Sequence, residues 1–271
     1  MKITEMIKNK GFTRSVELVP PRNGTDPAEI FSKVALIKDK VDFVSVTDGA
    51  GGSLRGGTLA ISHLVQENYG IKSMAHFVCR ERTKEQIENN LVDMHYFGVK
   101  NVLALRGDAP AGSAEGWIGE YEYAYKLVKQ ISNMNKGIYL PRKGQDVLHR
   151  EGVKTDFCIS VAGHPEDPIQ SEVSHLKAKI EAGATCIITQ MIFSFDEYKN
   201  YVEGLRQNGI DLPVIAGIRP LTTLKQAESV ENFFGIKICS ELKTGLEKEG
   251  FGLQYAKDAL SAVKKVNELI Q

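Results

Sequence analysis

The sequence predicts an α/β fold of the TIM type, a (β/α)8 barrel in which residues 1–271 form one domain. The length suits such a barrel, which takes ~250 residues, although length alone also allows two small domains. Short apolar runs alternate with segments of helical period, which is typical of βαβ units around a parallel sheet. Most conspicuous polar residues follow the apolar runs, at the strand ends where barrel enzymes build their sites.

The expected strands are apolar on both faces, as strands covered on both sides should be. Between them, apolar residues recur at helical spacing, as Ile87, Leu91 and Met94 do. The stretches Ala109–Glu120 and Lys136–Lys154 are expected to be loops. The expected strands are Ser15–Val19, Val41–Thr47, Ile71–Cys79, Asn101–Gly107, Asp156–Gly163, Cys186–Met191 and Pro213–Ile218.

A doubly wound open sheet would show a similar alternation, so the glycine pattern helps to decide between the two folds. No G-x-G-x-x-G motif follows the first expected strand. The glycine-rich run Gly49–Gly57 follows the second strand and lacks glycine at the required third place. A Rossmann dinucleotide site is therefore weakly supported, and the barrel is favoured.

Composition excludes several functional classes. With 34 basic and 34 acidic residues the formal net charge is zero, so no overall basic field attracts nucleic acid. No apolar run approaches the ~18 residues that suggest a membrane span, and the N-terminal residues predict a short surface helix instead of a signal peptide. The four cysteines show no C-x-x-C spacing, which fits buried thiols in a reducing cytoplasm. The histidines show no metal-binding spacing, so no metal site is expected.

Glu17 lies inside an apolar strand, where it should be buried or nearly so. Burial would raise the pKa of its carboxyl group and make it a candidate general acid. The alternative is a structural carboxylate paired with Arg14 or Arg22. Spacing alone does not separate the two.

Two further strand ends carry polar residues. Thr47, Asp48 and Gly49 end the second strand, where they either face a ligand or form a plain turn with Asp48 bonded to the following amides. The plain turn is favoured. His76 ends the third strand, and a satisfied core histidine is favoured there over a ligand or catalyst.

The ends of the fourth and sixth strands are also polar. Arg106 and Asp108 flank Gly107, which suits an anionic ligand better than an exposed ion pair. Gln190 offers a donor and an acceptor for the amide edge of a heterocycle, but satisfaction by neighbouring backbone is at least as probable.

In this order, the motifs resemble the methylenetetrahydrofolate reductase family. The resemblance runs from about residue 12 to 230, and the combination of the Glu17 strand with ALRGD is its most specific part. The motifs are Glu17 before Pro20-Pro21, VSVTDGAGGS, MAHFVC, NVLALRGD, ITQMIF and IAGIRPLTTLKQ, which ends at Gln226.

The resemblance implies a TIM barrel that binds FAD at the C-terminal strand ends and reduces methylenetetrahydrofolate by ping-pong hydride transfer from NADH or NADPH. Glu17 matches the acid that protonates the amine nitrogen of the bridging methylene, and Asp108 matches the aspartate that tunes flavin and pterin. Gln190 contacts folate and nicotinamide, and Gln226 falls among the substrate-binding positions. The implied cofactor contacts are Thr47, His76, Leu105, Arg106, Gly107 and Asp108, with Tyr123 and Ala124 on the adenosine side and Lys177 and Lys179 near the phosphates.

The chain also departs from the family pattern. Asp48 replaces a usual aromatic residue and adds a negative charge near the flavin, Val230 replaces an aromatic that stacks on folate, and His164 lies in a shortened stretch without an assigned role. The sequence ends after the last helix, so either it is truncated and lacks the eighth strand or the barrel closes differently. A second copy or an electron-transfer subunit then becomes an expected partner.

Two other functions remain open. One is a folate-binding methyltransferase or lyase that uses the same barrel without flavin. The other is a non-catalytic subunit of a one-carbon complex. The presence of Glu17, Asp108 and Gln190 argues against the second.

Overall fold

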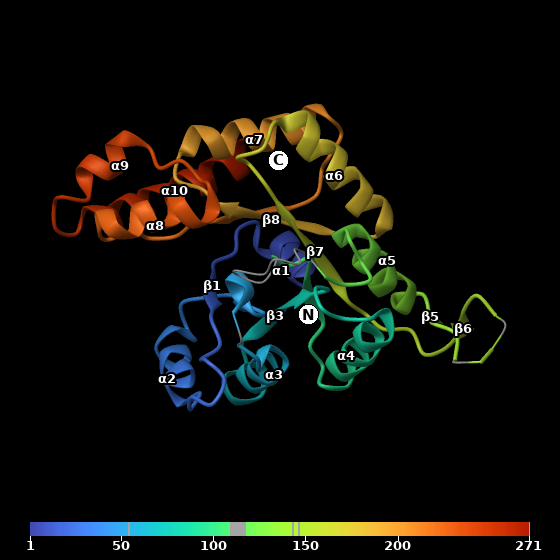
Figure 1. The fold of residues 1–271 in the computed structure, drawn as a ribbon. Coiled ribbons are helices and arrows are strands. Elements are labelled where there is room, and N and C mark those ends of the chain that lie inside the picture. Colours follow the sequence, from blue (N-terminus) through green and yellow to red (C-terminus); the bar gives the residue numbers. More distant parts are fainter. Residues whose placement is uncertain (54, 109–117, 143, 146, 271) are drawn as a thin grey trace. The chain divides into compact units, whose positions relative to one another are not determined.

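The computed structural model describes residues 1–271 except 54, 109–117, 143, 146 and 271. It divides into two compact units (Figure 1). The first unit contains Met1–Val161 and Ala178–Cys186, and the second contains Ala162–Lys177 and Ile187–Gln271. Each is described separately below.

The strands are parallel neighbours in the order in which they occur along the chain, as in a TIM-type barrel. The predicted α/β class is therefore confirmed, and no eighth strand of this sheet occurs within the described residues. The strands are β1 (Ser15–Leu18), β2 (Phe43–Val46), β3 (Lys72–Val78), β4 (Asn101–Leu105), β7 (Cys158–Gly163), β8 (Cys186–Met191) and β9 (Val214–Gly217).

Helices follow the strands, and their start points are encoded locally. Thr83, Ser194 and Thr223 each accept a hydrogen bond from a backbone amide in the first turn of the helix that follows. The helices are α1 (Ile3–Lys10), α2 (Ala28–Ile37), η1 (Ala50–Gly52), α3 (Thr58–Tyr69), α4 (Lys84–Tyr96), α5 (Ala124–Asn135), α6 (Ile169–Ala182), α7 (Phe195–Gln207), α8 (Leu224–Phe234), α9 (Ser240–Gly245) and α10 (Phe251–Ile270).

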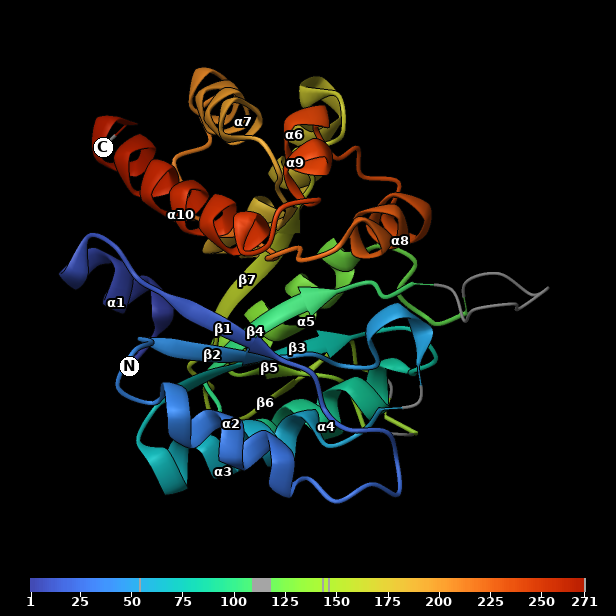
Figure 2. The same ribbon diagram turned by 90° about the vertical axis from the view of Figure 1, so that its left-hand side faces the viewer.

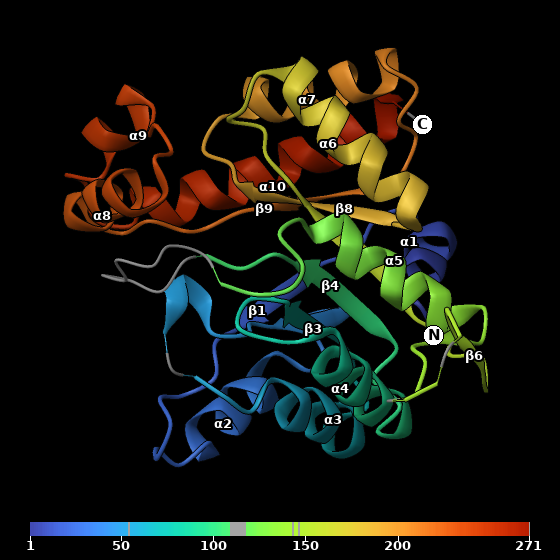
Figure 3. The same ribbon diagram turned by 45° about the vertical axis from the view of Figure 1, so that its right-hand side comes forward.

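One face of the first unit's sheet is an apolar core. Leu18, Val44 and Val46 point to this face and pack against Ile30 and Val34 of α2 and residues of α3. Figure 2 shows α2, α3 and α4 along this side of β1, β2 and β3, and Figure 3 shows α3 and α4 beside β3. Burial of these branched side chains fixes the strand register, because a shift by one residue would turn them to the opposite face.

The opposite face carries the alternate residues. The register aligns Glu17 with Ser45 and Met74, and Met74 with Asn101, so these side chains form one row across the sheet. At the amino ends of the strands α1 covers this face, because Asn101 Oδ1 accepts a hydrogen bond of 2.8 Å from Ile3 N. The N-terminal helix is thus more than a surface element, since Ile3 and Met6 are buried.

The second unit has its own core. Phe193, Leu221 and Val230 belong to a buried apolar cluster with residues of α9 and the segment before it. Tyr198 of α7 is fully buried, and its hydroxyl donates to Asn267 Oδ1 of α10 at 2.9 Å. No helix within the described parts of the chain is both long and apolar enough to span a membrane.

The stretch 136–154 is more ordered than the loop that the sequence predicts. It contains β5 (Ile138–Tyr139) paired with β6 (Arg150–Glu151), a hairpin that extends beyond the end of α5 (Figure 1). The cause is Glu88, a buried residue of α4 that accepts from Leu140 N and Arg150 Nη2, each at 2.7 Å. The sequence of this stretch is polar and does not indicate that Glu88, a distant residue, orders it.

Candidate active site at the strand ends

Glu17 is exposed, which contradicts the burial expected from the sequence. Its side chain is 58% exposed, because β1 is the first strand of the sheet and, within the described residues, has a neighbouring strand on one side only. Its Oε2 lies 3.7 Å from His76 Nε2. The structure therefore brings the expected acid together with a histidine, and desolvation by the described residues does not account for an acidic role.

His76 is buried in the carboxyl-terminal half of β3, with 9% of its side chain exposed. Burial lowers the pKa of His76 to about 4. The Glu17 carboxylate does not offset this, because water screens an exposed charge. At neutral pH the imidazole is therefore uncharged, and its contact with Glu17 is not an ion pair.

Two buried hydroxyl groups lie on the same face as His76. Thr47 follows β2, and Ser160 lies on β7 in the row that also contains Leu103 and His76. Thr47 Oγ1 and Ser160 Oγ are buried and have no hydrogen-bond partner within the described residues. Buried polar atoms are usually paired in native proteins, so these two hydroxyl groups are candidates for a hydrogen bond to water or to a ligand.

Asp48 binds the end of the next strand. Its Oδ2 accepts from Val78 N at 3.1 Å and from Arg82 Nη2 at 3.0 Å, and the Arg82 guanidinium lies 4.8 Å from the centre of the Phe77 ring. The favoured plain turn, with bonds to the following amides, is therefore wrong. The negative charge that replaces the usual aromatic residue is compensated by Arg82.

Gly107 permits a close approach between β4 and β3. It has a φ of +88°, and a Cβ at this position would lie 2.3 Å from Val78 Cγ1. A residue with a side chain would therefore push the two strand ends apart. The main chain here is also held by Arg80, whose Nη1 donates to Asp108 O at 2.5 Å.

The remaining predicted cofactor residues of this region lie at or near the surface. Arg106 and Asp108 are exposed, and Leu105 is half-buried at the end of β4. Tyr123 precedes α5 and stacks on Tyr125, with ring centres 5.9 Å apart, while Ala124 is the first residue of α5. Lys177 and Lys179 both lie on α6. Residues 109–117, most of the expected loop Ala109–Glu120, lie outside the described residues.

Gln190 and Gln226 belong to the second unit. Gln190 Oε1 accepts from Met191 N at 2.9 Å, so this oxygen is satisfied by neighbouring backbone, as the alternative expects. Gln226 Oε1 accepts from Thr222 N at 2.7 Å and so stabilises the start of α8. Val230 is buried in the apolar cluster, so it is not available as a contact for folate.

Glu172 is a residue that the sequence reasoning missed. It is fully buried in the first turn of α6, where Oε1 accepts from His164 N and from the Tyr201 hydroxyl, each at 2.9 Å. Burial and the Glu172 carboxylate raise the pKa of Tyr201. The helical spacing of Glu172 and Leu176 places the carboxylate on an apolar face, and this signal was available in the sequence.

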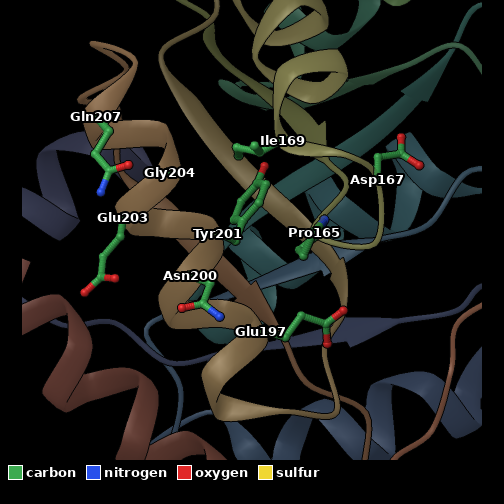
Figure 4. A pocket seen from close by; sticks show the side chains of 9 residues that line it. All are labelled: Pro165, Asp167, Ile169, Glu197, Asn200, Tyr201, Glu203, Gly204 and Gln207. Atoms are coloured by element: carbon green, nitrogen blue, oxygen red, sulfur yellow. The ribbon is translucent and has the colours of Figure 1, made fainter.

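The second unit also contains a pocket of about 500 Å³ between α7 and the segment before α6. Figure 4 shows Tyr201 and Ile169 at its centre and Glu197, Asn200 and Glu203 along α7. None of the predicted site residues lines it.

Comparison with known proteins decides the family. The model for methylenetetrahydrofolate reductase matches residues 2–250. The chain belongs to the methylenetetrahydrofolate reductase family. The family resemblance of the motifs around Glu17, Thr47 and Asp108 is thereby confirmed.

Individual relatives agree with the family model. Methylenetetrahydrofolate reductase 1 of Schizosaccharomyces pombe is 30% identical over 88% of this chain and 38% of its own length. Methylenetetrahydrofolate reductase (NADH) 1 of Arabidopsis thaliana is 32% identical over 91% of this chain and 42% of its own length. The chain therefore spans about two fifths of the length of these two relatives.

A solved structure shares the fold of this chain. It is an uncharacterized protein from Clostridium thermocellum that binds two copies of 5-methyl-5,6,7,8-tetrahydrofolic acid. The TM-score is 0.60 at 14% identity, and the match covers 97% of this chain and 86% of that one. At this identity the likeness shows the fold alone.

Proposed function

We propose that this protein reduces 5,10-methylenetetrahydrofolate to 5-methyltetrahydrofolate, with FAD as cofactor and NADH or NADPH as electron donor. The observation that carries the proposal is the grouping of Glu17, His76 and Thr47 on one face at the carboxyl ends of β1 to β3, in a chain of the reductase family. The relative named for NADH supports this donor, and the folate-binding structure supports the substrate class.

The residues at the ends of β2 to β4 fit FAD. The Thr47 hydroxyl has no partner within the described residues and offers a hydrogen bond, and Gly107 allows the ends of β3 and β4 to lie close together beside it. A bound flavin would supply the hydride-transfer chemistry between nicotinamide and folate. Arg106, Asp108, Tyr123, Ala124, Lys177 and Lys179 complete the proposed cofactor contacts.

The chain's own residues then supply the proton and the orientation. Glu17 donates a proton to the amine nitrogen of the bridging methylene, which opens the five-membered ring of the substrate. Gln190 and Gln226 hold the folate. The Asp48–Arg82 pair keeps the end of β3 in a fixed position beside the site.

The proposal also covers the cellular location and the partners of the protein. We place the protein in the cytoplasm, because its four cysteines are free thiols and a reducing compartment keeps them so. We further propose that it works as a homo-oligomer or with a partner subunit that delivers electrons.

Absorbance spectroscopy of the purified protein tests the cofactor and the donor. Flavin bands that bleach with NADH or NADPH, and return when methylenetetrahydrofolate is added, are the expected result. Bands that do not bleach would indicate a partner as electron donor. No bands after addition of FAD would refute the flavin-dependent function and favour a flavin-free folate enzyme.

A pair of variants tests the role of Glu17. Glu17→Gln is expected to leave reduction of the flavin within a few-fold of wild type and to slow the folate half-reaction by about 10²- to 10⁴-fold, the usual contribution of a general acid. Glu29→Gln, an exposed carboxylate on α2, serves as the matched control and should change neither half-reaction. Equal losses in both half-reactions of Glu17→Gln would refute the assigned role.

A further inference from the structure

Arg80 lies on the site face of the first unit's sheet, directly beyond the end of β3. A Cβ on Gly107 would lie 2.3 Å from Val78 Cγ1 and 3.1 Å from Arg80 Cβ, so the side chains of Val78 and Arg80 point to the same side. His76 precedes Val78 by two residues and shares this face, because side chains alternate along a strand. Arg80 therefore extends the row of His76 and Val78 toward the carboxyl ends of the strands.

The Arg80 side chain connects the ends of three strands. Its Nη1 donates to Asp108 O, after β4, at 2.5 Å. A Cβ on Gly49 would lie 3.5 Å from Arg80 Nη2, so the guanidinium also reaches the loop that follows β2. Thr47 lies at the start of this loop. The guanidinium thus lies between strand ends that carry two of the proposed cofactor contacts, Thr47 and Asp108.

The guanidinium is largely withdrawn from water, yet part of it is not used by the protein. The side chain of Arg80 is 10% exposed. Besides the bond from Nη1 to Asp108 O, its Nε donates to Glu81 Oε2 at 3.3 Å. A guanidinium offers five N–H donors, and those of Nη2 make no hydrogen bond within the described residues. Buried charges are normally paired and hydrogen-bonded, so Nη2 is a donor for water or for a bound group.

The carboxylates near Arg80 compensate its charge only in part. Glu81, its ion-pair partner, is 53% exposed, so water screens the charge of this carboxylate. The Asp48 carboxylate is paired with Arg82. Asp108 is exposed, and the atom that it offers to Arg80 is its main-chain oxygen. Within the described residues, Arg80 therefore places a positive charge on the site face, and burial of the guanidinium keeps the screening of that charge weak.

We propose that Arg80 is a further cofactor-binding residue, whose guanidinium donates from Nη2 to the flavin ring and stabilises the reduced form of the cofactor. Transfer of a hydride from the nicotinamide adds one negative charge to the flavin ring and leaves one positive charge on the nicotinamide. A cation beside the ring favours the added negative charge, so Arg80 raises the reduction potential of bound FAD. The inference rests on the proposed function for the identity of the cofactor.

The reduction potential of bound FAD tests the proposal. Arg80→Gln removes the charge and keeps an amide N–H for the Asp108 carbonyl oxygen. This variant is expected to bind oxidised FAD within a few-fold of wild type, but to lose about tenfold in its preference for reduced over oxidised FAD, the scale of one hydrogen bond to a charged group. A tenfold loss lowers the midpoint potential of a two-electron couple by about 30 mV. Equilibration of the FAD-loaded protein with a redox dye measures this potential.

Two further variants separate the charge of Arg80 from its structural bonds. Arg80→Lys keeps a cation, so its potential should stay closer to wild type than that of Arg80→Gln. Arg206→Gln is the matched control and should not change the potential, because Arg206 of α7 also donates to main-chain oxygens, those of Ile210 and Leu212. A potential that is unmoved or raised in Arg80→Gln, or that falls equally in Arg80→Lys, would overturn the proposal.

NMR of the wild-type protein keeps the proposal testable if Arg80→Gln does not fold. With ¹⁵N-labelled arginine, the guanidinium signals of Arg80 are assigned by their loss in Arg80→Lys. These signals should shift when FAD binds and shift again when the bound FAD is reduced. Signals that stay in place on reduction would show that the guanidinium does not contact the flavin ring.

The outcomes distinguish this inference from the proposed function. A protein that reduces folate, but with equal potentials in wild type and Arg80→Gln, refutes the role of Arg80 alone. A potential that falls in Arg80→Gln, in a protein that binds FAD and does not reduce folate, supports the role of Arg80 and refutes the reductase function. A wild-type protein that binds no FAD refutes both.

Discussion

The two faces of the first unit's sheet use the same strands in opposite ways. On the helix side, Leu18, Val44 and Val46 are buried against α2 and α3. On the other side, the same strands present Glu17 and Ser45, and Thr47 follows directly after them. Residues one position apart therefore serve the apolar core and the proposed site separately, because side chains alternate across a strand.

The difference between the two faces indicates which positions tolerate substitution. The helix-side face is stabilised by shape and apolar area, so its residues are replaceable by others of similar volume. The other face keeps buried hydroxyl groups that contribute no hydrogen bond to the described structure. A buried hydroxyl group without a hydrogen bond costs stability, so this face is not optimised for stability alone.

The largest expected effect is a cavity on the helix-side face. Leu18→Ala should lower the free energy of unfolding by about 3 kcal/mol, because it removes buried apolar volume. Urea unfolding followed by circular dichroism measures the loss. The affinity of the folded variant for FAD should stay within a few-fold of wild type. A large loss of affinity would contradict the separation of the two faces.

His76 should make the stability of the FAD-free protein depend on pH. Its pKa is about 4 in the folded protein against 6.5 as the ordinary value, so the unfolded chain binds the proton first as the pH falls. Stability is therefore complete above pH 6.5 and decreases by about 3 kcal/mol as the pH falls to 4. Urea unfolding at several pH values, compared with His76→Phe, isolates this contribution. Equal pH dependence in both proteins would show that the ring is not buried in solution.

The Asp48–Arg82 pair should have a smaller effect. Asp48→Ala removes two hydrogen bonds at the end of β3 and should cost about 1.5 kcal/mol, since the pair is only partly exposed. Glu203→Gln breaks an exposed pair with Lys199 and is the control, for which almost no change is expected. Thermal unfolding measures the decrease in melting temperature of each variant. Equal decreases would show that the Asp48–Arg82 pair contributes no more than an exposed ion pair.

The smallest effect on stability is expected at Thr47. Thr47→Val keeps the shape and removes a hydroxyl group without a partner, so the FAD-free protein should change by less than about 0.5 kcal/mol. Binding of FAD should weaken about tenfold, the scale of one lost hydrogen bond. Isothermal titration with FAD measures this, and unchanged affinity would remove Thr47 from the proposed cofactor site.

The sequence predicted the strands well and the surroundings of single residues poorly. Periodicity identified β1 to β4 because apolar side chains repeat along one chain segment. The exposure of Glu17 depends on the position of β1 at the start of the sheet, which no local pattern encodes. The bond between Asp48 and Arg82 joins residues 34 positions apart, so it depends on the register of neighbouring strands. The buried thiols of Cys79, Cys158 and Cys186 were predictable, because their apolar neighbours are local.

The hairpin of β5 and β6 should tolerate insertions and deletions. Its two ends are already joined, because Gly152 N donates to Gly137 O at 2.8 Å. The segment between them closes on itself and leaves the strands on either side in register. Its length can therefore grow or shrink by several residues at little cost in loop closure. Leu148 near the tip is 94% exposed, so a fluorescent label or a short grafted epitope can be attached there without disturbing the sheet.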